Sequence, residues 1–228
     1  MPDVVASTLR TQLMDVYQRL LEHFGDRQWW PADTREEMVI GAILVQNVSW
    51  QNTVVAIDRL REQGLLNFSA LVATPEPQLE ACIVSTRYYK TKAKKLKAFA
   101  QRLLDFHDGR LDHLLSQSMA DLRKELLTIW GIGPETADDI VLYAAGQPSF
   151  VVDAYTNRIF ARLGWTNMDM PYEQMRSWFM SALPPDAPLY NQYHALLDAL
   201  GHHFCLSRKP RCRECPLLPV CSESSNWV

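Results

Sequence analysis

The 228-residue sequence lacks the features of a membrane protein and of a secreted one. No apolar run comes near the roughly 20 residues that a membrane-spanning helix needs. The first residues, Met-Pro-Asp-Val-Val-Ala, have neither the basic start nor the apolar run of a secretory signal. We therefore expect no membrane partner and a cytoplasmic location.

The sequence also lacks an excess of positive charge. It has 23 Lys and Arg against 26 Asp and Glu, a formal net charge of −3. A global positive field is thus excluded as the basis for binding nucleic acid, and such a partner would have to be held by local patches. Residues 87–97 form one patch, with six basic residues and no acid. A solvated helix face is the ordinary explanation for such a run, and contact with a phosphate backbone is the functional one.

Strand-like alternation is nearly absent, and apolar spacing is helical almost throughout. One apolar stripe ends at Gly25, a plausible left-handed cap, and Thr34 with Glu37 predicts a capping box before a nearly all-apolar, buried helix. The Val151-Val152 pair is too short for a significant strand. The expected fold class is all-α, with further helices around residues 49–62, after Pro77, and around 96–106, 122–127, 140–144, 154–163, 172–183 and 191–202.

Cysteine is rare outside one short segment. Four of the five cysteines follow the spacing Cys205-x6-Cys212-x2-Cys215-x5-Cys221. Four thiolates this close together can hold one metal centre, either an iron–sulfur cluster or a structural zinc ion. A zinc ribbon usually has two CxxC pairs, whereas this run has one, which favours the cluster. Cys82 lies in an apolar segment and is expected to be a core thiol.

Two glycines interrupt the helical pattern at Gly131-Ile132-Gly133. Glycine permits positive φ angles, and backbone N–H groups beside a helix N-terminus form an anion site suited to a DNA phosphate. Ile132 should anchor the turn in the core. A lone GxG between helices is most often only a tight connection. Twenty residues later, Asp153 follows an apolar pair at the start of an amphipathic helix, where by itself it could be only an N-cap.

The hairpin, the aspartate and the cysteine run occur in the order and spacing that resembles the helix-hairpin-helix DNA glycosylase superfamily. The cysteine spacing is similar to that of the endonuclease III and adenine-glycosylase branches, and the resemblance covers about residues 24–221. It implies an endonuclease III-like two-domain helical fold with a C-terminal [4Fe-4S] cluster loop. Residues 28–147 would form a six-helix domain, and residues 1–27 with 148–228 the cluster domain, with a flipped-out nucleotide bound in the cleft between them.

The resemblance also implies roles for individual residues. Asp153 would stabilise the positive charge that develops on the sugar as the base leaves. Gln46 would enter the gap left by the flipped nucleotide, with Asn47 beside it, and Tyr88 would be the wedge in the base stack, preceded by Arg87 in place of the usual glycine. Further DNA-contacting or pocket candidates are Gly131, Ile132, Gly133, Glu135, Thr136 and Tyr155, and the cluster ligands are Cys205, Cys212, Cys215 and Cys221.

Two departures from the family pattern bear on the chemistry. Glu135 stands where bifunctional members have a Schiff-base lysine, and a carboxylate cannot form an imine, so we expect hydrolytic base release unless Lys90 or Lys92 supplies an amine. Tyr155 stands where endonuclease III enzymes have histidine, and the segment is closer to the alkyladenine-removing relatives. Together with Gln46-Asn47 and the aromatics Trp29, Trp30 and Trp50, this favours an alkylated purine as substrate.

The sequence therefore predicts a monomeric base-excision DNA N-glycosylase with a [4Fe-4S] cluster, acting on double-stranded DNA that contains a damaged or mismatched base. In a prokaryote it would be associated with the nucleoid. Two alternatives stay open. One is a bifunctional glycosylase/AP lyase acting on damaged pyrimidines, and the other is a protein that binds damaged DNA without catalysis.

Overall fold

The computed structural model describes residues 2–223, with side chains from residue 8 onward. Within this range the chain is helical and contains no strand, which confirms the all-α prediction. Contacts divide the chain into unit 1 (Met1–Trp29 with Pro148–Val228) and unit 2 (Trp30–Gln147). None of the described helices is both long enough and apolar enough to cross a membrane.

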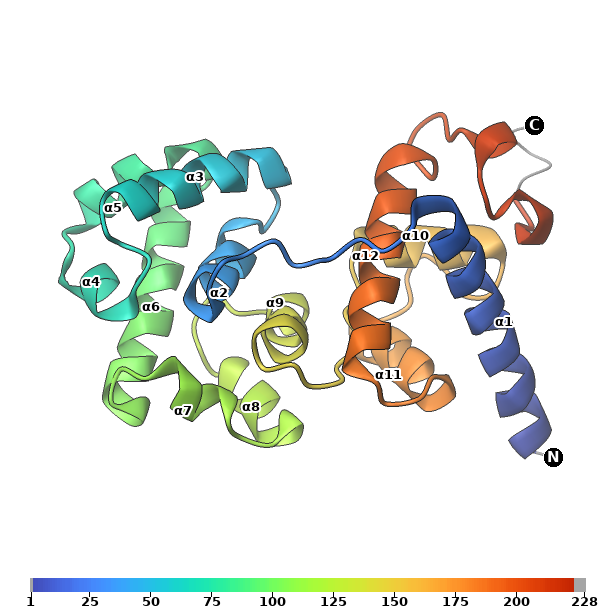
Figure 1. Cartoon of the computed structure of the whole chain (residues 1–228), viewed down its shortest axis with the longest axis horizontal. Helices are drawn as coiled ribbons and strands as arrows, with labels where there is room; N and C mark the ends of the chain where they lie inside the picture. Colours follow the sequence, from blue (N-terminus) through green and yellow to red (C-terminus); the bar gives the residue numbers. More distant parts are fainter. Residues whose placement is uncertain (1, 224–228) are drawn as a thin grey trace. The chain divides into compact units, whose positions relative to one another are not determined.

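Unit 2 is built around one buried helix, α2. Its residues from Glu37 to Leu44 are all buried, and it contacts α3, α6, α9 and η2 (Figure 1). An apolar surface on every side requires such a central position. Thr34 caps α2, as predicted, by accepting a hydrogen bond of 3.1 Å from the backbone N–H of Glu37. The elements of unit 2 are α2 (Arg35–Leu44), α3 (Trp50–Glu62), α4 (Phe68–Ala73), α5 (Glu76–Cys82), η1 (Val84–Thr86), α6 (Tyr89–His107), α7 (Leu111–Leu115), α8 (Met119–Leu126), α9 (Pro134–Asp139) and the π-helical η2 (Ile140–Ala144).

Unit 1 joins the N-terminal helix to the C-terminal part of the chain. Helix α12 packs against both α1 and α10. The Tyr193 hydroxyl, fully buried on α12, donates a hydrogen bond of 2.7 Å to the carbonyl oxygen of Leu13 on α1. Aromatic rings also pack in this core, where those of Phe150 and Phe179 stack with centroids 3.9 Å apart. The elements of unit 1 are α1 (Pro2–Phe24), α10 (Ala154–Leu163), α11 (Tyr172–Ala182), α12 (Ala187–His203), η3 (Cys212–Glu214) and η4 (Leu218–Val220).

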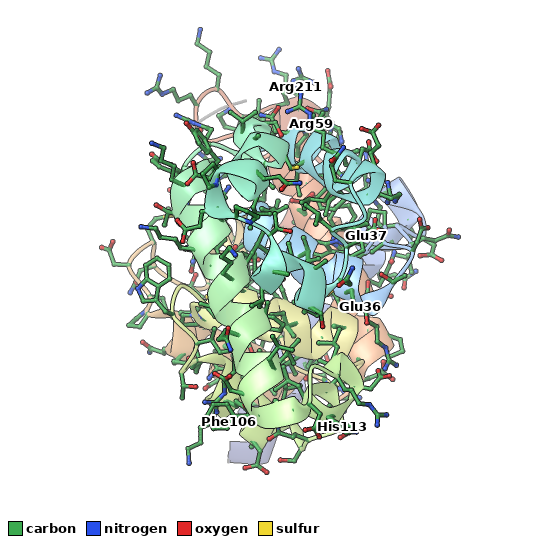
Figure 2. All side chains as sticks on the ribbon, turned by 90° about the vertical axis from the view of Figure 1, so that its left-hand side faces the viewer. Glu36, Glu37, Arg59, Phe106, His113 and Arg211 are labelled. Carbon is green, nitrogen blue, oxygen red and sulfur yellow. The ribbon has the colours of Figure 1, made fainter. Side chains whose placement is uncertain are left out.

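A polar cluster around Glu125 joins α8 to the C-terminal end of α6. The Glu125 carboxylate accepts hydrogen bonds of 2.8 Å from Arg102, 2.8 Å from His107 and 2.7 Å from Gln117. Burial alone would raise the pKa of Glu125, but these three donors outweigh it and lower the pKa to about 2. The Arg102 guanidinium also lies 3.7 Å over the exposed ring of Phe106, which is at the end of α6 in Figure 2. One carboxylate on α8 therefore holds three donors, two from α6 and one from the loop before α8.

We expect Glu125→Gln to lower the free energy of unfolding by about 2 to 3 kcal/mol at neutral pH, because the neutral amide loses the charge-assisted bonds. The folded-state pKa lies below the ordinary value, so the stabilisation is complete above about pH 4.5 and is lost as the pH falls toward 2. Urea denaturation of the wild type and of Glu125→Gln should show that the difference between their free energies of unfolding becomes smaller near pH 4. Glu62→Gln, at an exposed site, is the control. A difference that does not change with pH would contradict this account.

Candidate functional site

Asp153 is the N-cap of α10, and the cap uses one of its two carboxylate oxygens. Oδ1 accepts hydrogen bonds of 2.7 Å from both the backbone N–H and the hydroxyl of Thr156. Oδ2 lies 3.9 Å from Nε2 of His194, and the Asp153 side chain is 15% exposed. Two bonds from one residue hold the carboxylate in one orientation. The capping role and a catalytic role are therefore compatible, since the cap leaves Oδ2 for another contact.

Helix α12 lines the surroundings of Asp153 with further polar groups. His194 and Asp198 lie one turn apart on this helix, and His194 is the residue whose Nε2 lies 3.9 Å from Oδ2 of Asp153. Burial raises the pKa of Asp198, and the Asp153 charge raises it further. Burial likewise raises the pKa of Tyr155, whose ring packs so closely on Gly201 that a Cβ there would lie 2.5 Å from it. The sequence interpretation identified Tyr155 but missed the two α12 residues, whose only signal is their i, i+4 spacing.

The four cysteines of the C-terminal run lie in a loop that α10 supports. Arg158 donates a hydrogen bond of 2.7 Å to the carbonyl oxygen of Cys205. Arg162 donates 3.3 Å to the Cys205 sulfur and 2.7 Å to the carbonyl oxygen of Leu206. The helix that begins at Asp153 therefore also holds the cysteine loop. Sequence reasoning missed both arginines, although they too are four residues apart.

The cysteine loop has the donor chemistry of a cluster site. Burial raises the pKa of Cys215, and the neighbouring thiols of Cys205, Cys221 and Cys212 add to this effect, to give a pKa of about 11. Among residues 2–223, no three His, Cys, Asp or Glu side chains form a group that could hold a metal ion. In a [4Fe-4S] cluster each thiolate binds a different iron. Four thiols with an arginine donor to one sulfur fit this group chemically.

The hairpin departs from the sequence interpretation at one glycine. Gly131 has a φ of +86°, which favours glycine, whereas Gly133 has a φ of −91° and a ψ of 177°, an extended conformation open to any residue. Gly133 is the N-cap of α9 and does not need positive φ. Ile132 is buried in the core of unit 2, as predicted, while Glu135 is exposed on the first turn of α9.

Gln46 follows the end of α2 and lies against this hairpin. Its Nε2 donates hydrogen bonds of 2.9 Å to the Thr136 hydroxyl and 3.3 Å to the carbonyl oxygen of Gly131. Its Oε1 accepts a hydrogen bond from Nζ of Lys95 on α6. The structure thus brings together Gln46, Gly131 and Thr136 of the predicted site, and adds Lys95, which the sequence identified only as part of the basic run 87–97.

The segment before α6 shows two exposed features. Tyr88 is 66% exposed, consistent with a wedge role. Arg87 has a φ of 53° and a ψ of 161°, a backbone conformation that is almost restricted to glycine. The loop therefore keeps a glycine-like backbone although its residue is arginine. Asn47, also exposed, has a φ of 57°, which asparagine tolerates better than most residues.

The basic run 87–97 is not the uniformly solvated face that its composition suggested. Arg87, Lys90 and Lys94 are exposed, whereas Lys92 is buried and Lys95 and Lys97 are partly buried. The reason is helical periodicity, which turns one side of α6 toward the core whatever the local charge.

A cavity of about 400 Å³ lies in unit 2 between α3 and the segment before α2. The rings of Trp30 and Trp50 meet edge to face in its wall, with centroids 5.3 Å apart. Arg61 contacts three carboxylates, at 2.9 Å from Glu37, 2.6 Å from Asp58 and 3.8 Å from Asp33. Three carboxylates against one guanidinium leave the wall with negative charge. The residues that line the cavity are Trp30, Pro31, Ala32, Asp33, Glu37, Trp50, Val54, Ile57, Asp58 and Arg61. Trp29, grouped with these aromatics from the sequence, is not among them.

Comparisons with known proteins agree with this architecture. Residues 40–185 match the HhH-GPD superfamily of base excision DNA repair proteins. A protein of Methanocaldococcus jannaschii named "Putative DNA repair glycosylase" is 40% identical over 208 residues, 90% of this chain and 94% of that protein. The chain belongs to the HhH-GPD superfamily.

Solved structures confirm the endonuclease III-like fold of this HhH-GPD protein. A trapped endonuclease III–DNA covalent intermediate has a TM-score of 0.83 at 24% sequence identity, with 95% of this chain and 97% of that chain covered. A 3-methyladenine DNA glycosylase of H. pylori bound to 1,N6-ethenoadenine has a TM-score of 0.71 at 21% identity, with 86% and 97% covered.

The conformation of Arg87 predicts that Arg87→Gly stabilises the protein. Relief of the strained backbone is worth about 1 to 3 kcal/mol, and the greater freedom of glycine in the unfolded chain offsets part of it, so the free energy of unfolding should rise by about 1 kcal/mol. Arg87→Ala is the matched control, because it removes the guanidinium but keeps Cβ. Urea denaturation compares the three proteins. If the glycine variant is no more stable than the alanine variant, the strain is not real.

Proposed function

We propose that this HhH-GPD protein is a DNA N-glycosylase that hydrolyses the N-glycosidic bond of a flipped-out damaged base, with an alkylated purine as preferred substrate. The supporting observation is the carboxylate of Asp153, held by Thr156 through one oxygen while the other is left for the reaction. A fixed carboxylate stabilises the oxocarbenium-like charge on the sugar without reorganising during the reaction.

Water is the proposed nucleophile in base release. Glu135 is exposed on the first turn of α9, at the position where an imine-forming enzyme of this family would need an amine. A carboxylate there cannot attack the sugar as an amine would. The carboxylate of Asp153 orients the water, or takes its proton, while it counters the positive charge on the sugar.

Several parts of the protein are suited to hold the DNA around the lesion. The hairpin offers the backbone N–H groups of Gly131 and Gly133 to a phosphate, whereas the N–H of Ile132 donates to the carbonyl oxygen of Ile129. Such a site needs no positive side chain, which fits a net charge of −3. The exposed ring of Tyr88 is the proposed wedge, and Gln46 the residue that fills the gap. Arg208, Lys209, Arg211 and Arg213 are exposed on the cysteine loop and suit further phosphate contacts.

The cavity of unit 2 supports the choice of an alkylated purine. Its two tryptophan rings and its excess of carboxylates favour a cationic base, such as a purine alkylated at N3 or N7. Such a base also leaves easily, so little acid catalysis is required. The solved 3-methyladenine glycosylase with a related fold adds to this support.

The structural match to endonuclease III favours a second candidate, an enzyme acting on damaged pyrimidines. A panel of duplexes, each with one lesion and read by mass spectrometry, separates the two. Release of oxidised pyrimidines without release from methylated DNA would establish the second candidate.

We also propose that Cys205, Cys212, Cys215 and Cys221 hold a [4Fe-4S] cluster. When bound, the cluster ties the loop together and fixes the surface that carries the four basic residues. The hydrogen bond from Arg162 to the Cys205 sulfur would compensate part of the thiolate charge.

Asp153→Asn should reduce single-turnover release of an alkylated purine by about a hundredfold or more, because the amide keeps the cap but loses the charge. DNA binding should persist. The matched control is Asp186→Asn, since Asp186 caps α12 with a hydrogen bond of 2.8 Å from the Leu189 N–H.

If the wild type and Asp153→Asn release the base at equal rates, Asp153 takes no part in base release. A wild type inert on the whole lesion panel, but able to bind the duplexes, would instead support a protein that binds damaged DNA without catalysis. Borohydride added during base release tests the water step, because a covalent protein–DNA adduct that forms as fast as the base is released would overturn hydrolysis.

Anaerobically purified protein should be yellow-brown and contain about four irons per chain. Cys215→Ser should lower the iron content and the visible absorbance, whereas Cys82→Ala, in the core of unit 2, should change neither. Metal analysis and absorption spectra measure both. Stoichiometric zinc in a colourless protein would show that the site is a zinc site.

A further inference from the structure

The lysines of the basic run differ in what their amines contact. Lys92 is 2% exposed, and its Nζ donates hydrogen bonds of 2.8 Å to the carbonyl oxygen of Leu44 and 2.5 Å to that of Thr86. Burial lowers its pKa to about 8, but no sugar can reach an amine enclosed between two backbone segments. Lys97 likewise donates to the carbonyl oxygens of Val72 and Thr74. Lys92 and Lys97 therefore support the fold.

Lys95 differs because its amine reaches the hairpin. Its stem covers Gly131 so closely that a Cβ there would clash with it. Its Nζ contacts Gln46 Oε1, and the Nε2 of the same amide is 2.9 Å from the hydroxyl of Thr136. The amine is thus one glutamine side chain away from Thr136, the neighbour of Glu135. Helix α6 therefore brings a primary amine to the hairpin, beside Gly131 and, through Gln46, Thr136.

The contacts of Lys95 also suit a reactive amine. Its acceptor is a neutral amide, so loss of the proton breaks no ion pair with Gln46. Partial burial lowers the pKa of Lys95, which increases the fraction of neutral, nucleophilic amine. The side chain is only partly buried, unlike that of Lys92.

We propose that Lys95 forms an imine with the abasic sugar left by base release, and that this gives a strand-cleaving step slower than hydrolysis of the base. The proposal rests on the proposed function only for the origin of that sugar. The neutral amine adds to the C1′ aldehyde of the ring-opened sugar, and the resulting carbinolamine loses water to form the imine. Water removes a C2′ proton, the C3′–O bond breaks with its electron pair leaving on the 3′ phosphate, and hydrolysis of the imine restores the lysine.

The experiment uses a duplex with a preformed abasic site, so that it does not depend on which base the enzyme releases. Borohydride reduces the imine to a stable amine, and the adduct is measured per bound duplex, with binding determined on a tetrahydrofuran duplex that has no aldehyde. Wild type should form an adduct whose modified peptide contains Lys95. Lys95→Arg keeps a positive charge and a donor for Gln46, but its guanidinium does not lose its proton, so the adduct should fall by at least about tenfold.

Lys94→Arg, at the adjacent exposed position on α6, is the matched control and should form as much reduced adduct per bound duplex as the wild type. The proposal is overturned if wild type gives no adduct, if Lys95→Arg traps as efficiently as wild type, or if the modified peptide contains another residue. Each of these results leaves base release by Asp153 to be judged by its own assay. Conversely, if no lesion of the panel is released, the result with the abasic duplex can still be interpreted.

Discussion

The hydrogen bonds between Asp153 and Thr156 are the constraint on which the candidate chemistry depends. They stop rotation of the carboxylate and start α10 at the same residue. The same helix then presents Arg158 and Arg162 to the cysteine loop, so one ten-residue element positions both the carboxylate and the proposed cluster site. A displacement of α10 would affect both at once. Asp153, proposed for the reaction, and Arg158 and Arg162, which hold the cysteine loop, therefore lie close together in the sequence although their roles differ.

The hairpin in unit 2 depends on a second set of contacts. The absence of a Cβ at Gly131 makes room for the Lys95 stem, and the Lys95 amine in turn orients the Gln46 amide toward Thr136. Four residues from three separate segments fix one another, and none of them is held by local sequence alone. The conformation of the hairpin therefore depends on contacts with distant segments as well as on its own turn.

Local signals predicted much of the fold and part of the site. The all-apolar helix α2 with its Thr34 cap, the buried Ile132 and the start of α10 at Asp153 follow from short-range rules. Contacts between distant segments could not be read in this way, and they decide the role of Lys95, the inward turn of Lys92 and the place of His194 beside Asp153. Helix α12 was expected from residue 191 but begins at Ala187, because Asp186 caps it and Pro188 suits its first turn.

The backbone at Arg87 shows that the shape of a loop can outlast the residue that usually permits it. Arg87 and Tyr88, between η1 and α6, both have positive φ, and such a conformation persists only where the surrounding structure holds it. A sequence pattern that demands glycine at this position would reject the present chain, although its backbone there has a conformation that favours glycine. Profiles for such loops would recognise more members if they scored the flanking helices together with the residue at the bend.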